Sequence, residues 1–353
     1  MALYLDTTIQ PAKVYIQAAP RTCIKSDAFD ITLLILPLAT GLGAVAAVLA
    51  NPALFAVLLV ADLWLLGYHH VVATYTRLAF TKEALRRNRF LAIDLLLLMA
   101  AATLALAVTA GAWVVATAFL YLQWFHYMRQ GCALARMYFR ATPDGQVAGS
   151  RDLTSDLVIY LVPIYGIAAR SATMGDTFLD LPVKTVGLPQ EVITALGFAA
   201  AVAGLVWLVR SSISFVRGTL DTLYAGFVLS HVAIFLVAYI GIEDAGTGWL
   251  AIDVWHNLQY VLVVWMMNQK KYAGGVDPAA QFVSRISQPG RLAIYFASCL
   301  GISTLVYVVL GSFVAIAGGG LAITAGIYMG INFHHYVIDA LISKRRPVIP
   351  RSI

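Results

Sequence analysis

Long hydrophobic runs separated by short polar segments are the main pattern of the chain. Ten mostly apolar runs are each long enough for a helix to cross a hydrocarbon core of about 30 Å. They fall at 29–50, 54–76, 90–109, 112–130, 156–171, 192–210, 219–241, 248–267, 292–313 and 319–342. The alternation typical of a transmembrane barrel is absent. The pattern predicts an all-α, polytopic membrane helix bundle with about ten transmembrane helices.

Composition supports this prediction. The chain is 60% hydrophobic and 12% charged, with a mean hydropathy of +0.80, whereas a soluble domain carries about 25% charged residues. The first 27 residues are polar and lack the apolar centre of a signal peptide. We expect a single transmembrane domain over residues 1–353, with a cytoplasmic segment at 1–28, the bundle at 29–342 and a tail at 343–353.

The basic residues predict the orientation of the bundle. If the N-terminus is cytoplasmic, every Lys and Arg except Arg170 and Lys184 falls in a segment on the cytoplasmic side. This positive-inside bias predicts that both termini are cytoplasmic, and we expect a bacterial inner (plasma) membrane location. It also explains the net charge of +6 without nucleic acid, since basic loops contact the anionic lipids of the bilayer.

All the histidines of the chain lie inside predicted spans. A single intramembrane histidine is more often an interhelical hydrogen-bonding group than a ligand. When every histidine of the chain lies at membrane depth, where polar side chains are costly, one shared role is the simplest explanation. At a rise of 1.5 Å per residue, five helices bring imidazoles to a band roughly 12 to 21 Å from the inner basic residues. The sequence therefore predicts a metal site whose candidate ligands are His69, His70, His126, His231, His256, His334 and His335.

Carboxylate and amide side chains accompany these histidines on the same helices. Such groups orient ligating imidazoles and raise their basicity; the candidates, as ligands or supporting groups, are Asp62, Gln123, Asp253, Asn257, Asn332 and Asp339. Helical spacing places Asn332, His335 and Asp339 on one face, and Asp62 with His69 on another. Adjacent helical residues point about 100° apart, so one ion rarely takes both members of a pair. We favour His69, His126, His256 and His335, with a second metal as an alternative.

Histidine with some carboxylate suits a transition metal, most of all one or two iron ions, with copper or zinc as alternatives. The three cysteines are far apart and form no metal-binding spacing. We expect O2-dependent oxidation (hydroxylation, desaturation or cleavage) of a hydrophobic small molecule, with an electron donor on the cytoplasmic side. The HxxxH and HxxHH boxes of membrane desaturases are absent, so the sequence indicates no family, and it assigns no catalytic residue.

Two other functions fit the histidines. Single histidines on separate helices can hold heme or chlorophyll in a subunit of an electron-transfer complex. Chains of His and Asp can instead carry protons in a proton-coupled transporter.

Overall fold

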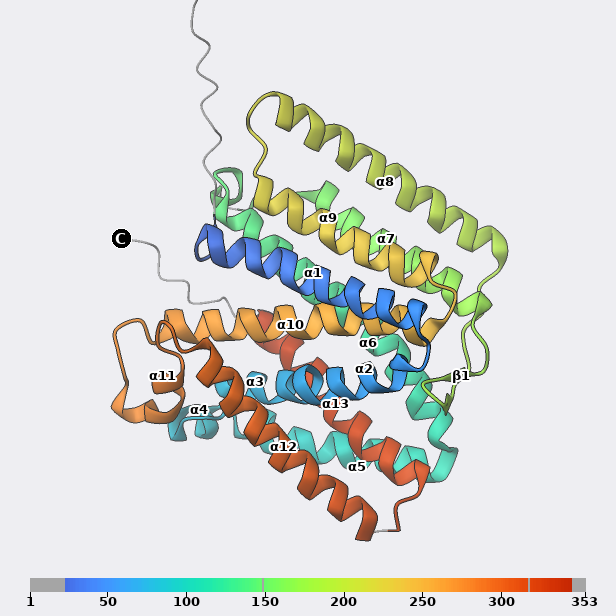
Figure 1. Ribbon diagram of the computed structural model, residues 1–353, viewed down its shortest axis with the longest axis vertical. Helices are drawn as coiled ribbons and strands as arrows, with labels where there is room; N and C mark the ends of the chain where they lie inside the picture. The colour runs from blue at the N-terminus through green and yellow to red at the C-terminus, as the bar shows by residue number, and fades with distance from the viewer. Residues whose placement is uncertain (1–22, 148, 317, 345–353) are drawn as a thin grey trace, which may run out of the picture.

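The computed structural model of the protein is a bundle of long helices (Figure 1). It describes residues 23–147, 149–316 and 318–344; most of the expected N-terminal segment and tail lies outside the described residues. In chain order the helices are α1 (Asp27–Ala50), α2 (Leu54–Asp62), α3 (Tyr68–Leu78), α4 (Lys82–Arg87), α5 (Leu95–Ala110), α6 (Ala112–Ala141), α7 (Leu153–Thr173), α8 (Gln190–Val216), α9 (Thr222–Leu236), α10 (Ala245–Lys271), α11 (Gln281–Ile286), α12 (Leu292–Ile316) and α13 (Leu321–Lys344).

Short elements connect or extend these helices. A π-helical turn at Leu63–Gly67 joins α2 to α3, and others at Phe90–Asp94 and Val237–Gly241 adjoin α5 and α9. One-turn 3-10 helices lie at Asp144–Gln146 and Pro278–Ala280. Between α7 and α8 the strands β1 (Thr177–Phe178) and β2 (Leu181–Pro182) pair antiparallel.

Seven helical stretches of the described chain are long and apolar enough to cross a membrane. They are α1, α2 through α3, Phe90 through α5, α7, α8, α9 through Gly241, and α12. The structure thus confirms the predicted all-helical bundle, and its long apolar helices are consistent with a multi-pass membrane protein. The number of crossings and the side of each terminus stay predictions.

The remaining predicted spans fall on α6, α10 and α13, which are also long helices. These three carry His126, His256 and the His334–His335 pair, together with Asn and Gln side chains. Polar side chains lower the mean hydropathy of a helix and are tolerated in a bundle only where they face protein. These three helices therefore bring polar side chains to the protein interior.

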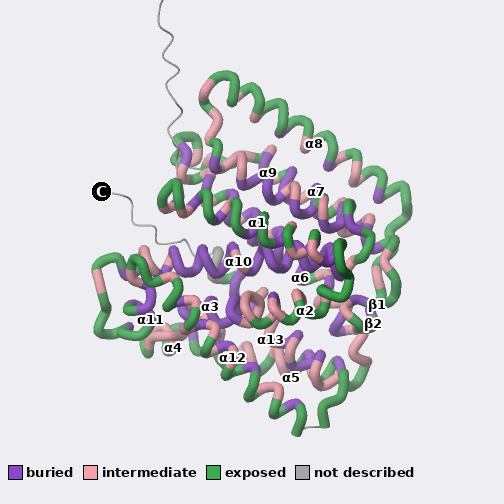
Figure 2. The backbone as a smooth tube through the Cα atoms, viewed as in Figure 1, coloured by how far each residue is buried: buried purple, intermediate pink, exposed green. Residues whose placement is uncertain are grey.

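Helix α10 occupies the centre of the bundle, whereas α8 lies at one edge (Figures 1 and 2). From Gly246 to Met266 every residue of α10 except Leu258 is buried. Helices α1 and α3 pack along it, and α9 and α12 also contact it. Helix α8 exposes large apolar side chains such as Phe198 and Leu205. A helix buried on all sides is the natural place for side chains that must be kept from lipid.

Helix α13 is positioned by a close contact with α5, its most extensive neighbour. Gly326 and Gly330 form a GxxxG pair, the spacing that lets two membrane helices approach closely. A Cβ placed on Gly330 would lie 2.8 Å from the Cα of Ala100, and one on Gly326 would lie 2.7 Å from the Cα of Leu104. The Thr103 hydroxyl also donates a 2.7 Å hydrogen bond to the Gly326 carbonyl. This contact fixes the helix that carries His335.

We predict that Gly330→Ala destabilises the bundle, because the added methyl group meets backbone and forces α5 and α13 apart. Overpacking of this kind costs about 1–3 kcal/mol, and the measurement is the thermal unfolding midpoint of the detergent-purified protein. Gly301→Ala in α12 is the matched control, since its Cβ would meet no atom within 4 Å. Equal midpoints for the two variants would contradict the proposed role of the contact.

Candidate metal centre

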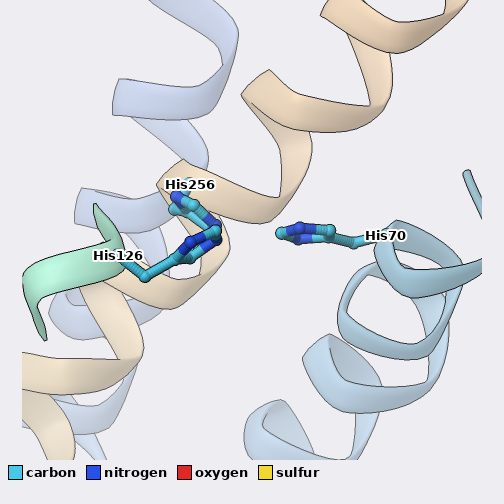
Figure 3. Close-up of side chains that lie close together, drawn as sticks. All are labelled: His70, His126 and His256. Atoms are coloured by element: carbon cyan, nitrogen blue, oxygen red, sulfur yellow. The ribbon is translucent and has the colours of Figure 1, made fainter. Parts of the chain in front are cut away.

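Four buried imidazoles from four helices converge in the interior. His70 of α3, His126 of α6 and His256 of α10 point toward one another (Figure 3), and their ligand nitrogens all lie within 4.8 Å of one another. His335 of α13 completes the cluster, with its Nε2 atom 2.7 Å from Nε2 of His70 and its ring centroid 5.0 Å from that of His126. We call these four residues the histidine cluster.

The cluster could hold a metal ion. An ion bound at about 2.1 Å keeps its ligand atoms at most about 4.2 Å apart, so a small rotation of the imidazoles brings the nitrogens to one ion. Both ring nitrogens of His256 and the Nε2 atom of His126 are buried and have no hydrogen-bond partner among the described residues. Buried nitrogens without a partner are costly, and a cation in the cluster removes this cost for one nitrogen of each imidazole that binds it.

The π-helical turn at Leu63–Gly67 explains why His70, and not His69, reaches the cluster. In a regular α-helix Asp62 and His69, seven residues apart, share a face, while His70 points about 80° away. The π turn winds more residues into one turn and so rotates His70 onto the side of Asp62. His69 instead packs edge-on against Phe296, with ring centroids 4.3 Å apart. Helical spacing alone does not reveal this shift.

Hydrogen bonds orient two of the imidazoles. The side-chain oxygen Oδ1 of Asn257 lies 2.7 Å from Nδ1 of His70. Because an amide oxygen only accepts, Nδ1 of His70 is the donor, and Nε2 carries the lone pair. In this structure that lone pair accepts from Nε2 of His335 at 2.7 Å, and it is the atom that an ion would take. Nδ1 of His335 lies 3.1 Å from the hydroxyl of Thr74. Ligating histidines commonly use their second nitrogen in this way.

A chain of hydroxyl groups continues from His335 toward the end of the bundle where Arg77 and Lys270 lie. The Thr74 hydroxyl is 2.8 Å from the hydroxyl of Tyr260, which donates to Oδ1 of Asp339 at 3.2 Å. When an ion is bound to Nε2 of His335, its Nδ1 carries the proton and is the first donor, and each hydroxyl then accepts one bond and donates the next. We call His335, Thr74, Tyr260 and Asp339 the hydroxyl chain; all four residues are buried.

A pair of buried carboxylates adjoins the cluster on its other side. Asp253 accepts hydrogen bonds from the hydroxyl of Tyr127 and, at 3.4 Å, from the side-chain amide of Gln123. Asp62 interacts with Asp253 and Asn257, although its oxygens have no partner of good hydrogen-bond geometry. The ring of Tyr127 lies 4.4 Å from that of His256. Carboxylates here add oxygen ligands or counter-charges beside the nitrogen ligands.

The other candidate residues lie apart from the cluster. His231 contacts the Ile159 carbonyl at 3.2 Å, and His334 contacts the Leu91 carbonyl at 2.7 Å. Asn332 donates within its own helix, to the carbonyl of Tyr328 at 2.9 Å. These interactions are the ordinary use of polar side chains between or along membrane helices. Of the seven histidines, the structure thus brings together His70, His126, His256 and His335.

Thr74 and Tyr127 are site residues that the sequence analysis did not identify. Thr74 follows His70 by four residues and therefore lies on the same helical face, so this spacing could have revealed it. Tyr127 neighbours His126 in sequence, but its contact with Asp253 depends on how α6 packs on α10. No local pattern predicts that contact.

A cavity of about 680 Å³ lies between α6, α10 and α13 and reaches the cluster. His126, Tyr260 and Asp339 are among the residues that line it. Leu122 and Phe125 also line it, and both are exposed on the outer surface of the bundle. The cavity therefore joins the histidine cluster to a surface that faces lipid when the chain is in a membrane.

No protein-family model, curated protein or solved structure matches this chain.

The adjacent histidines provide a matched test of the metal centre. We predict that His70→Ala lowers the bound metal of the purified protein at least about tenfold, as expected when a ligand is lost. His69→Ala should retain the wild-type content, because its ring faces Phe296. The measurement is elemental analysis of protein purified without chelator. Equal metal loss in both variants would contradict the assignment of His70 as a ligand.

Proposed function

We propose that the chain is a membrane-embedded metalloenzyme that uses O2 to oxidise a lipophilic substrate beside the histidine cluster. The observation that carries this proposal is that one cavity reaches both His126 and the outer apolar surface. A hydrophobic molecule can enter such a cavity from the bilayer without crossing water. Hydroxylation, desaturation and cleavage all fit this arrangement.

The donor set supports a redox metal. Imidazole nitrogens suit iron, copper and zinc, and the nearby carboxylates favour iron among these. A heme takes one or two axial ligands on opposite faces of a flat macrocycle, whereas these imidazoles pack against one another, with ring centroids 4.3 to 6.1 Å apart. One ion would be held by the histidines, and a second would draw on Asp62 and Asp253.

The reaction also needs protons and electrons. Hydroxylation of a C–H bond by O2 forms the alcohol and water and consumes two electrons and two protons. The metal, when bound, supplies the activation of O2; a reductant on the basic side of the bundle supplies the electrons. The hydroxyl chain supports a supply of protons, since it joins the cavity at Asp339 to His335 through Tyr260 and Thr74.

Isotope labelling tests the proposed oxidation. Membranes that contain the protein are incubated under 18O2, and their extracted lipids are compared by mass spectrometry with those from His256→Ala membranes. We predict an 18O-labelled or desaturated lipid that depends on His256, because loss of this ligand removes the ion. His69→Ala membranes serve as the control and should form the product. Identical lipid profiles in wild-type and His256→Ala membranes would refute the oxidase function.

The hydroxyl chain gives a second test. Tyr260→Phe removes the hydroxyl that joins Thr74 to Asp339, so we predict at least about a tenfold loss of product with metal content unchanged. Tyr75→Phe is the matched control, since its hydroxyl contacts the Ala92 carbonyl outside the chain. Unchanged product in Tyr260→Phe would exclude this proton route.

Proton-coupled transport is the second candidate, because the same hydroxyl chain could carry protons without a metal. A purified protein that is colourless and free of metal would favour it. The direct measurement is proton movement into liposomes that contain the protein, compared between the wild type and Asp339→Asn.

A further inference from the structure

The cavity beside the cluster has an apolar part and a strongly basic part. Helix α6 forms one wall along a single helical face, from Leu122 and Phe125 through His126 to the arginines Arg129, Arg136 and Arg140. Met99 and Phe333 extend the apolar part, and Arg77 adds a fourth arginine to the lining. An apolar chain and an anionic group could thus be held at different depths of one cavity.

The charges of the cavity are only partly balanced by protein. Arg136 pairs with Asp156 at 2.9 Å, in contact through two guanidinium nitrogens. Asp339 interacts electrostatically with both Arg77 and Arg129. Two carboxylates therefore face four guanidinium groups, and Arg140 forms no ion pair with the part of the chain that the structure describes. The cavity is complementary to an anion at its basic end.

The dimensions favour a ligand with one long chain. Arg140 follows His126 by fourteen residues, which is roughly 21 Å along the helix axis. A volume of about 680 Å³ lies in the range of sites that hold one small molecule, roughly 300–1,000 Å³. A molecule that spans this distance within this volume is long and narrow.

We propose that the cavity binds a single-chain amphiphile whose anionic end group lies at Arg140 and whose hydrocarbon chain extends along α6 to His126. A planar carboxylate matches the guanidinium group, which can donate two parallel hydrogen bonds. This inference rests on the proposed function in one respect, since it names the substrate class for oxidation near the far end of the chain. The binding itself does not require the metal.

Photocrosslinking tests the site and the direction of the chain. The probe is a long-chain fatty acid with a diazirine at its methyl end, added to the full-length protein in phosphatidylcholine nanodiscs. We expect labelled peptides around Leu122 and Phe125 of α6 and around Phe333 of α13. Labelling spread evenly over lipid-facing helices such as α8 and α12 would overturn the proposal, because it would show only bilayer contact.

Variants test the role of the anionic group. Arg140→Gln should weaken labelling about tenfold, the effect of losing one charge-assisted hydrogen bond. Arg217→Gln removes a charge at the C-cap of α8, outside the cavity lining, and should label like the wild type. The methyl ester of the probe should label weakly. Equal labelling by acid and ester, or by the two variants, would overturn the proposal.

Two further comparisons separate this inference from the proposed oxidation. His256→Ala should still be labelled, because His256 does not line the cavity; labelling lost in this variant would count against a metal-independent binding site. Excess two-chain phosphatidylglycerol should not displace the probe, whereas a long-chain alkyl phosphate should. Displacement by phosphatidylglycerol would show that an ordinary bilayer lipid occupies the cavity.

Discussion

The cost of burying polar groups among apolar helices governs this structure. Every polar side chain that is removed from water needs a partner, since an unpaired one costs free energy comparable to several packing contacts. The bundle limits this cost by grouping many of its buried polar residues on α3, α6, α10 and α13 and by surrounding α10 almost completely. His231 and His334 find backbone carbonyls, and His335 finds Thr74. The nitrogens of His256 and of His69 find none among the described residues. Only His256 converges with other imidazole nitrogens, whereas His69 packs on Phe296, and this convergence separates a ligand candidate from a packing residue.

The need of buried polar groups for hydrogen-bond partners also explains several contacts around the histidine cluster. Asn257 accepts from Nδ1 of His70, so the Nε2 lone pair of His70 points into the cluster, toward Nε2 of His335. Tyr127 donates to Asp253 beside His256. His70 and Asp253 of the proposed metal centre thus have partners of their own, and the helices are fixed by close contacts such as that of Gly330 with α5. Partners and close helix contacts of this kind limit the orientations of these side chains before any ion or substrate arrives.

The sequence predicts much of this arrangement. Long apolar runs predict the helices, and the depth of the histidines predicts a common band, because both depend on a rise per residue that hardly varies. The choice within the pair His69–His70 could not be made in this way, since a π turn has no clear sequence signal. The hydroxyl chain and the cavity could not be predicted either. They depend on how α6, α10 and α13 rotate against one another, which local spacing does not determine.

The π turn before His70 has a consequence for comparisons among homologues. It amounts to one residue inserted into an otherwise regular helix, as such turns commonly are. A relative with a regular helix at this point would be one residue shorter, and its single inward-facing histidine would occupy the place of His70. Aligned without a gap, it would match His69 instead. Residue identity at this pair should therefore be judged only after a one-residue gap has been allowed within Leu63–Gly67.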